Sequence, residues 1–472
     1  MAAVWSRRWF FVSVCCFLLL LVVSGTVTEQ VLPGSVLEVG WLWLQAVRTV
    51  WGRVVDCVTT VPDPYHWKTY VYLAILTSAL SGGYIVLFRP LNRIRKLGDI
   101  GYIAEGSLTA RETANFVQRR RRVGSVPPVY PNGWFAVMES FSLHTGQATT
   151  VSILGLNLAV FRDDYGVAHV LDAYCPHMGA NLGAGGRVKG NCLECPFHAW
   201  RFRGEDGRCT HIPYSDKVPE IAKVKSWPVT EVNGWLYMWY HAEGLDPTWK
   251  LPEIEEISNG SWVYRGRTEH MVNAHIEEIP ENGADVSHLG HVHGPIIAAG
   301  IDLRYMWSKL WSFAQHHWTA GWEPMSAPEA HVGQLRLEHG ISLFGVRMPF
   351  LDLYVTAKQI GPGVVYLMFE SVFGRGMFIH NLTPVEPMVQ KMVHNIYVSW
   401  TMPVPIAKFY MLGEALQVER DVMIWNNKQY ESKPLFVKSK EDGLISKHRR
   451  WYSQFYSENS PRLQFKTDSV DW

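Results

Sequence analysis

Residues 170–200 read VLDAYCPHMGANLGAGGRVKGNCLECPFHAW, and this stretch decides the fold of the chain around it. It places Cys175 and His177 in one group and Cys195 and His198 in a second, so each group offers a thiol and an imidazole. Tetrahedral zinc also accepts two Cys and two His, but zinc sites usually keep like ligands together along the chain. The interleaved order favours a [2Fe–2S] cluster, with two thiolates on one iron and two imidazoles on the other.

Around these four ligands the sequence resembles the Rieske domain. The resemblance spans about residues 131–240 and includes VLDAY at 170–174 and FHAW at 197–200. Glycines flank the ligand groups, and glycine lets two loops fold closely over a cluster. The resemblance implies that the Rieske cluster is bound by Cys175, His177, Cys195 and His198.

The other cysteines of this region distinguish between kinds of Rieske domain. Respiratory-chain Rieske proteins add a disulfide between the two loops, and the corresponding positions here are Ala180 and Phe197. The resemblance therefore points to the oxygenase or ferredoxin kind, with a lower reduction potential. Cys192 and Cys209 have no place in the motif and are interpreted as structural thiols.

A group of histidines follows in the stretch ENGADVSHLGHVH at residues 281–293. The spacing of Asp285, His288 and His293 resembles the mononuclear-iron motif of Rieske non-haem oxygenases, in which the two histidines are ligands. Residues five apart cannot share one face of a straight helix. We therefore expect Gly290 to break the helix so that both rings converge, and we interpret His291 as a surface or supporting residue.

A non-haem Fe(II) site of this kind needs one carboxylate beside two histidines, with positions left open for O₂. Residues 414–425, EALQVERDVMIW, read as an amphipathic helix near the C-terminus. In the family the carboxylate is an Asp of such a helix, and Asp421 matches it, with Glu419 as the fallback. The alternative is that Asp421 pairs with a neighbour such as Arg420.

The resemblance also implies supporting residues and partners. Asn282 would lie near the iron without being a strong ligand, and Asp285 would bridge the iron site to a Rieske histidine of the neighbouring subunit in a homotrimer. Electrons would come from NAD(P)H through a separate reductase. The chain has no G-x-G-x-x-G followed by a suitably placed acidic residue, so it is not expected to bind NAD(P)H itself.

Composition limits the other functions. The chain has 472 residues, with 44 Lys and Arg against 43 Asp and Glu, and this balance argues against nucleic acid as a partner. Hydrophobic residues make up 47% and charged residues 18%, which excludes a disordered protein. The low charged fraction fits a protein attached to a membrane.

Two apolar runs support attachment to a lipid bilayer. Residues 9–27 are either an anchor or a cleaved signal peptide, and residues 69–88 carry no charge and are long enough to span a bilayer. A buried helix of a soluble protein is the alternative for the second run. Cations that follow the second run predict that the rest of the chain faces the cytosol, and they are Arg89, Arg93, Arg95 and Lys96.

We expect an α+β chain of four parts. These are a membrane anchor region with transmembrane segments (residues 1–100), a linker (101–130), an all-β Rieske [2Fe–2S] domain (131–242) and a mononuclear non-haem iron catalytic domain (243–472). The family's catalytic domain has a helix-grip fold, an antiparallel sheet around a long helix. Strands are expected within residues 363–369, 377–379 and 395–400, with a strand and turn at 381–385.

Aromatic residues are frequent in the C-terminal part. They could line a lipid pocket, although ordinary core packing is the simpler interpretation. They are Trp307, Trp311, Phe313, Trp318, Trp322, Phe344, Phe350 and Tyr354.

An anchor, a Rieske domain and this catalytic domain together resemble the Neverland-type cholesterol 7-desaturases of animals, over nearly all of the chain. The resemblance implies conversion of cholesterol to 7-dehydrocholesterol with O₂ and NAD(P)H, at the endoplasmic reticulum membrane. A steroid-ring hydroxylase and a chlorophyll-type oxygenase are the nearest enzyme alternatives. Two alternatives are not oxygenases: a membrane-tethered Rieske electron carrier and a zinc scaffold. Analysis of the bound metals distinguishes both from an oxygenase.

Overall fold

The computed structural model describes residues 45, 67–103, 106–120 and 126–463. The chain divides into two compact units, residues 1–89 and residues 90–472. The first apolar run, residues 9–27, lies outside the described residues, so the structure does not test whether it is an anchor.

Helix α3 (Trp67–Leu87) belongs to the N-terminal unit. Its stretch from Tyr70 to Leu87 has a mean hydropathy of 1.6 and contains no Asp, Glu, Lys or Arg. With 21 residues, the helix is close to the length that spans a bilayer, about 20 residues. Its length and composition therefore allow α3 to cross a membrane.

The second unit contains three small antiparallel sheets, which confirm the all-β prediction for the Rieske region. Strand β12 (Trp235–Tyr240) is buried at every position because neighbouring structure covers both of its faces. It lies between β2 (Gly133–Glu139) and β11 (Val229–Val232). A second sheet contains β3 (Ala148–Ile153), β4 (Leu156–Arg162), β5 (Ala168–Asp172) and β10 (Ser226–Trp227). A third contains β6 (Arg187–Lys189), β7 (Cys192–Glu194), β8 (Arg201–Arg203) and β9 (Cys209–His211).

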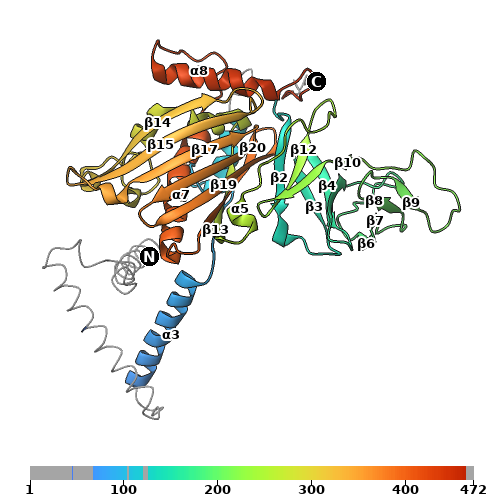
Figure 1. Cartoon of the computed structure of the whole chain (residues 1–472), viewed down its shortest axis with the longest axis horizontal. Coiled ribbons are helices and arrows are strands. Elements are labelled where there is room, and N and C mark those ends of the chain that lie inside the picture. The colour runs from blue at the N-terminus through green and yellow to red at the C-terminus, as the bar shows by residue number, and fades with distance from the viewer. Residues whose placement is uncertain (1–44, 46–66, 104–105, 121–125, 464–472) are drawn as a thin grey trace. The chain divides into compact units, whose positions relative to one another are not determined.

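A nine-stranded sheet forms the rest of the unit, and Figure 1 shows the small sheets at one end of it. Its order is β1-β13-β20-β19-β18-β17-β15-β14, with β16 paired to β15. All of its pairs are antiparallel except that of β1 with β13. The strands are β1 (Leu91–Arg95), β13 (Trp262–Val272), β14 (Ala314–Pro324), β15 (Val332–Leu343), β16 (Val346–Arg347), β17 (Leu353–Ile360), β18 (Val364–Ser371), β19 (Gly374–Glu386) and β20 (Val389–Ser399).

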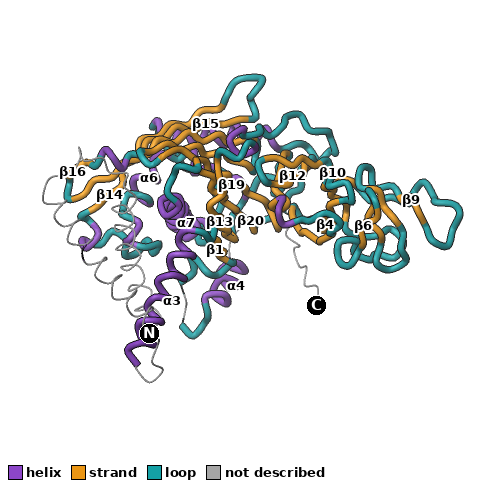
Figure 2. The backbone as a smooth tube through the Cα atoms, turned by 60° about the horizontal axis from the view of Figure 1, so that its bottom comes forward, coloured by secondary structure: helices purple, strands orange, loops and turns teal. Residues whose placement is uncertain are grey.

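Helix α7 (Val404–Trp425) runs along one face of this sheet, with α6 (Val286–Val292) beside it (Figure 2). The prediction of a helix at residues 414–425 is confirmed, but α7 starts ten residues earlier. Pro403 precedes its first turn, a position that tolerates the fixed φ of proline. The other α-helices within the described residues are α4 (Ala110–Arg120), α5 (Glu255–Ser258) and α8 (Lys440–Tyr452).

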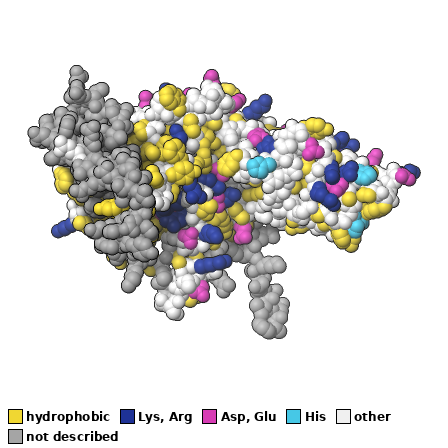
Figure 3. Space-filling view, turned by 90° about the horizontal axis from the view of Figure 1, so that it is seen from below, with side chains coloured by type: hydrophobic (Ala, Val, Ile, Leu, Met, Phe, Trp, Pro, Cys, Tyr) yellow, Lys and Arg dark blue, Asp and Glu magenta, His cyan; other side chains and the backbone are white. Residues whose placement is uncertain are grey.

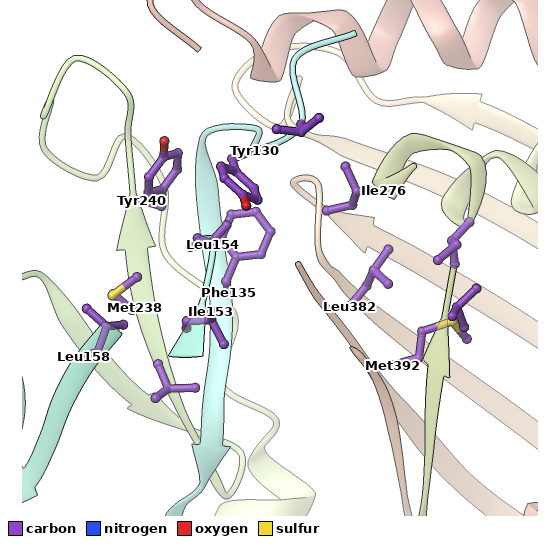
Figure 4. Packing of buried hydrophobic residues seen from close by; sticks show 14 of the residues in the cluster. Tyr130, Phe135, Ile153, Leu154, Leu158, Met238, Tyr240, Ile276, Leu382 and Met392 are labelled. Carbon is purple, nitrogen blue, oxygen red and sulfur yellow. The ribbon is translucent and has the colours of Figure 1, made fainter. Parts of the chain in front are cut away.

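Two of the small sheets share a hydrophobic core with the large sheet. Figure 4 shows Phe135 and Met238 of the small sheets on one side and Leu382 and Met392 of the large sheet on the other. The Leu154 amide also donates to the Pro384 carbonyl oxygen at 2.6 Å. Because burying each large apolar side chain contributes about 1.5–3 kcal/mol, this core holds the two regions together.

Several expectations need correction. Residues 91–95 were expected in the anchor region, but they form β1 of the large sheet. The expected linker contains helix α4. No turn occurs at residues 381–385, because β19 continues to Glu386. The three other predicted strands coincide with β18, β19 and β20, although Gly363 and Trp400 lie just outside the observed strands.

The aromatic residues of the C-terminal part are mostly not core. Trp322 is buried, with 4% of its surface exposed, and it contacts Trp451 of α8. Trp311 and Trp318 are half-buried. The others are exposed, which makes the core interpretation wrong for them, and they are Trp307, Phe313, Phe344, Phe350 and Tyr354.

Candidate metal centres and substrate cavity

Two similar turns carry the Cys and His pairs of the Rieske motif. The first follows β5, where the Gly179 amide donates to the Cys175 carbonyl oxygen at 2.8 Å. The second follows β7, where the Ala199 amide donates to the Cys195 carbonyl oxygen at 3.1 Å. Gly179 and Ala199 both adopt positive φ angles, of 75° and 56°, to close these turns. Each turn therefore presents its Cys and, two or three residues later, its His.

Burial separates the two kinds of ligand. Cys175 and Cys195 are 3% and 2% exposed, whereas His177 is exposed and its ring centroid lies 4.7 Å from that of His198. Figure 3 shows histidine side chains at the surface of this end of the molecule. Burial raises the pKa of Cys175 to about 11, and the neighbouring Cys195 thiol adds to the rise. Two buried thiols side by side become thiolates readily only beside a cation, which fits an iron-sulfur cluster.

The disulfide of respiratory-chain Rieske proteins is absent, since all four described cysteines are free. Cys192 and Cys209 are buried in the third small sheet. The Cys192 thiol contacts the Thr210 hydroxyl at 3.5 Å, and the Cys209 thiol donates to the His211 carbonyl oxygen at 3.5 Å. These contacts agree with the interpretation of both as structural thiols.

The second predicted site brings its three ligand candidates together. His293 Nε2 lies 3.2 Å from Asp421 Oδ1, and His288 Nε2 lies 4.0 Å from the same oxygen. The two rings are 5.0 Å apart and cross at 78°, so their nitrogens converge. Two imidazoles and one carboxylate around one point are the donor set of a non-haem Fe(II) site. The residues present therefore fit the metal that the sequence predicts.

The convergence of the two histidines has a different cause from the predicted one. Gly290 does not break α6, which continues to Val292. His293 instead terminates the helix as its C-cap, with φ −107° and ψ 0°. Asp285 is the N-cap, and its carboxylate accepts from the His288 amide at 3.2 Å. One short helix therefore carries one histidine in its first turn and the other just after its end.

Helix α7 supports the site with two residues that the sequence analysis missed. Gln417 Oε1 accepts from His293 Nδ1 at 2.9 Å, which turns His293 Nε2 toward Asp421. Arg420 is fully buried and donates to the carbonyl oxygens of four residues at and after the end of α6, at 2.9–3.2 Å. Those residues are Val292, Pro295, Ile296 and Gly300. The i and i+4 spacing of Gln417 and Asp421 was the available sequence signal.

The fallback ligand is elsewhere. Glu419 is fully buried, and its carboxylate accepts from Arg93 at 2.8 and 2.9 Å and from Arg95 at 3.0 Å. Burial would raise its pKa, but hydrogen bonds from His270 and the two arginines outweigh burial and lower the pKa to about 2. Glu419 is thus committed to a structural ion pair. Arg420 donates to carbonyl groups. The alternative, in which Asp421 pairs with Arg420, is therefore wrong.

The remaining candidates surround the triad. Asn282 lies in the turn η3 (Pro280–Gly283) and lines the same cavity as Asp421. Glu281 holds this turn against α8 through a bidentate ion pair with Arg449. The Asp285 side chain is 31% exposed, and His291 is an exposed residue, as expected.

A cavity of about 200 Å³ lies between the sheet and α7 beside Asp421. Its apolar lining includes Ile279, Trp322, Leu335, Leu367, Leu382, Met392, Val418 and Trp425. Polar lining side chains are few and include Asn282, His380 and His394. A mostly apolar lining with a few polar groups is typical of ligand sites, and the volume here is smaller than the usual range of about 300–1,000 Å³.

Comparison with known families agrees with this architecture. Residues 133–228 match the Rieske [2Fe-2S] domain, and residues 238–456 match the 3-ketosteroid 9alpha-hydroxylase C-terminal domain. Cholesterol 7-desaturase nvd of Xenopus laevis is 52% identical over 391 residues, which cover 83% of this chain and 86% of that protein. The chain belongs to the Neverland-type cholesterol 7-desaturases, within the Rieske oxygenases.

More distant members of this group also match. The Neverland-type enzyme of Drosophila melanogaster, named cholesterol 7-desaturase nvd, is 41% identical over 77% of this chain and 83% of its own length. A Rhodococcus rhodochrous protein named probable 3-ketosteroid-9-alpha-monooxygenase, oxygenase component, is 31% identical over 71% of this chain and 82% of its own length.

Solved structures share the fold of this Neverland-type chain. Dicamba monooxygenase bound to 3,6-dichlorosalicylic acid superposes with a TM-score of 0.50 and 18% identity, covering 70% of this chain and 98% of that structure. NdmA of Pseudomonas putida CBB5 with caffeine also has a TM-score of 0.50 and 18% identity, covering 68% and 89%. At this identity the likeness shows the fold alone.

A second cluster of two histidines and a carboxylate faces the same cavity. His380 of β19 and His394 of β20 are directly opposite each other, with rings stacked 3.7 Å apart at 17°. Glu414 Oε1 of α7 accepts from His394 Nδ1 at 2.6 Å and lies 3.5 Å from His380 Nε2. Burial lowers the pKa of His380 to about 3 and raises the pKa of Glu414, so His380 is neutral at pH 7.

Proposed function

We propose that this chain is a cholesterol 7-desaturase. In the net reaction, cholesterol loses one hydrogen each from C7 and C8, and O₂ takes these hydrogens with two electrons and two protons to give two water molecules. NAD(P)H supplies the electrons through a separate reductase. The observation that carries the proposal is the 52% identity with a protein named cholesterol 7-desaturase over most of both chains, together with the converging triad beside an apolar cavity.

Each part of the chain has its own task in this proposal. Cys175, His177, Cys195 and His198 hold the [2Fe–2S] cluster, and His288, His293 and Asp421 hold the mononuclear iron. An iron held by these three residues would supply the oxidising chemistry. The apolar cavity excludes water and orients the sterol beside the triad. Transfer of the apolar ring system from water to this apolar surface is favourable. Asn282 lies beside the reacting carbon atoms without holding the metal.

We assign residues 131–242 to the Rieske domain and residues 243–472 to the catalytic domain, with β1 (Leu91–Arg95) contributed to the catalytic sheet from the N-terminal side. This assignment is supported by the separate sheets of the two regions. The residues before β1 form the anchor region, of which α3 is the bilayer-crossing helix. A substrate that resides in a bilayer is most accessible to an enzyme held at its surface.

The orientation that we infer places the catalytic domains in the cytosol, at the endoplasmic reticulum. Four cations within ten residues after α3 support it, since positive charges stay on the cytosolic side. Exposed Asn259 heads an Asn-Gly-Ser acceptor sequence, which would receive a glycan in the lumen. An endoglycosidase-sensitive glycan on Asn259 would contradict this orientation.

We further propose a homotrimer in which electrons pass from the Rieske cluster of one subunit to the iron of the next, through Asp285. Support comes from the arrangement within one chain. The Rieske strands β6–β9 lie at one end of the molecule and β14, which packs on α6, lies at the other (Figure 1). Asp285, 31% exposed, and the exposed His177 are accessible to another subunit.

Mixed subunits test this arrangement. Cys175→Ser removes a cluster ligand and Asp421→Ala removes an iron ligand, so each variant alone is expected to be inactive. Co-expression of the two variants should restore part of the activity if electrons cross between subunits. Differently tagged subunits show whether mixed oligomers form. If they form and activity is still not restored, the intersubunit path is excluded.

The activity itself is tested by sterol analysis of cells that express the full chain and receive labelled cholesterol. Labelled 7-dehydrocholesterol is expected from the wild type and not from Asp421→Ala. A steroid-ring hydroxylase is the second candidate, favoured by the family match to a steroid hydroxylase domain. A labelled hydroxysterol without the diene would replace the proposed reaction with that one.

A further inference from the structure

The polar groups of the cavity lie in two places. Asn282 and Asp421 belong to the iron end. His380 and His394 lie on the neighbouring strands β19 and β20, in a wall that is otherwise mainly apolar. An isolated polar pair in an apolar wall is the arrangement that recognises a ligand with one polar group.

The other polar side chains that line the cavity have fewer unbonded donors and acceptors for a ligand. Gln359 Nε2 donates to the Gly361 carbonyl oxygen at 3.3 Å, and its Oε1 accepts from His448 Nε2 at 3.3 Å, so its amide is already bonded on both sides. Asn381 is 1% exposed and its Oδ1 accepts from the Tyr237 hydroxyl at 3.0 Å. Its Nδ2 has no partner among the described residues, but Asn381 directly follows His380 in β19, so the two side chains point to opposite faces of the sheet.

Each imidazole of the pair has a free nitrogen. Glu414 Oε1 accepts from His394 Nδ1 at 2.6 Å, whereas His380 Nε2, 3.5 Å from the same oxygen, has no hydrogen-bond partner among the described residues. His394 Nε2 and a nitrogen of His380 can therefore bond a ligand. The His380 side chain is 20% exposed although it lies deep in the fold, and it lines the cavity.

The spacing of Glu414 and Asp421 along α7 is of the same order as the length of the A and B rings of a steroid with its 3-oxygen. Glu414 and Asp421 are seven residues apart on α7, which is two turns on the same face, or about 10.5 Å. In a rigid steroid nucleus the oxygen on C3 is roughly 6 Å from C7, by addition of ordinary bond lengths. A reacting carbon sits about 3–4 Å from its reaction partner. A sterol that lies along α7 with C7 at the triad thus brings its hydroxyl group to His380 and His394.

We propose that His380 and His394, oriented by Glu414, bind the 3-hydroxyl group of the sterol. Glu414 is a positioning residue, because it touches the imidazoles and not the ligand. This inference rests on the proposed function and deepens it, since it says which sterols the cavity accepts. Sterols that lack the hydroxyl leave these buried nitrogens unpaired, which is costly.

The same cluster does not have the geometry of a metal site. An imidazole nitrogen coordinates a metal along the plane of its ring, so two rings that share a metal must be inclined toward it. The rings of His380 and His394 are stacked at 17°, and His394 Nδ1 already donates to Glu414 at 2.6 Å. A hydroxyl ligand needs no such convergence.

Competition between two substrates tests the proposal. Microsomes that contain the full chain receive NADPH and equal amounts of labelled cholesterol and labelled cholest-5-ene, which lacks the 3-hydroxyl group. Wild type is expected to favour cholesterol in kcat/KM by at least about 100-fold, as buried hydrogen-bonding sites reject analogues that lack the group. His380→Phe and His394→Phe should each lower this ratio at least about tenfold, and Glu414→Gln should lower it less.

Controls separate the possible failures. Asp163→Asn removes the carboxylate of another buried His–carboxylate pair, with His169 at 3.0 Å, and should leave the ratio unchanged. A Phe variant that loses its Rieske spectrum has not folded correctly. The substrate preference is then measured in Glu414→Gln and Glu414→Asp instead. Unchanged discrimination in correctly folded variants overturns the proposal, as does a fourth metal atom per chain that Glu414→Gln removes. A wild type that makes no 7-dehydrocholesterol contradicts the proposed function instead.

Discussion

Two clusters in the catalytic region contain the same three groups, two imidazoles and one carboxylate, but their geometries differ. In the cluster of His288, His293 and Asp421 the rings cross at 78° and their centroids are 5.0 Å apart. In the cluster of His380, His394 and Glu414 the rings are stacked at 17° and 3.7 Å. The backbone explains this difference. Opposite positions on paired strands hold two rings parallel, whereas the two ends of a short helix let them converge.

The identity of three side chains therefore does not by itself define a metal site. Both carboxylates come from the same helix α7, two turns apart, so they do not account for the difference. What separates the clusters is the element that carries the histidines, α6 for one and the β19–β20 pair for the other. Four changes test this comparison.

The largest effect is expected from Asp421→Ala. The first cluster loses its carboxylate, so we expect the chain to retain two iron atoms, those of the Rieske cluster, in place of three, and to lose at least about 99% of its activity. Iron analysis and the EPR signal of the reduced cluster measure the outcome. Glu414→Ala is the matched control and should retain all three iron atoms. Loss of iron from Glu414→Ala would mean that the two clusters do not differ as described.

Glu419→Gln is expected to affect stability and not iron content. Removal of this carboxylate leaves Arg93 and Arg95 without their shared partner, and because both are partly exposed we expect a loss of about 2–3 kcal/mol. Thermal unfolding of the full chain in detergent, followed by circular dichroism, measures this loss. If the variant kept its stability but lost one iron atom, Glu419 would be a ligand after all.

Gln417→Ala should weaken the first cluster by a smaller amount. It removes the acceptor that orients His293, and loss of such a supporting hydrogen bond typically lowers metal affinity by about 10–100-fold. Titration of the metal-depleted protein with Fe(II) under anaerobic conditions reports the affinity. Gln417→Glu keeps an acceptor and should restore much of it, and equal losses in both variants would argue against an orienting role.

The smallest effect is expected from the pH dependence of stability. The pKa of His380 is 6.5 in an unfolded chain and about 3 when buried, so the unfolded state binds more protons as the pH falls below 6.5. The unfolding free energy is therefore lost in this window, by at most about 1.4 kcal/mol per pH unit for this group. His380→Phe should make Tm fall less steeply between pH 6.5 and pH 5. His144→Phe, at an exposed position, is the control and should show the wild-type slope.

The sequence was most informative where ligands are close along the chain. The four Rieske residues lie in two short loops, and His288 and His293 lie in and just after one short helix, so the motifs that carry the family resemblance are local. The second cluster could not be predicted in this way. Its histidines meet only in the register of β19 with β20, and that register shifts between Pro384 and Glu386 at an irregularity that spacing does not reveal.

Long-range pairing explains why Glu419, the fallback ligand, is paired elsewhere. The residue is two positions before Asp421 in the sequence, which made it a reasonable second choice of ligand. Its partner Arg93 is 326 residues away, and no local pattern indicates that pair. The fold class was predictable because alternation and motif spacing are local. The contacts between α7 and β1 arise from tertiary packing.

The parallel pairing of β1 with β13 has a practical consequence for producing a shortened protein. Three residues separate the end of α3 at Leu87 from the start of β1 at Leu91. A truncation that starts beyond Arg95 to remove the whole anchor region also removes an edge strand and both arginine partners of Glu419. Expression without the apolar helix therefore has a narrow choice of first residue, between Phe88 and Leu91.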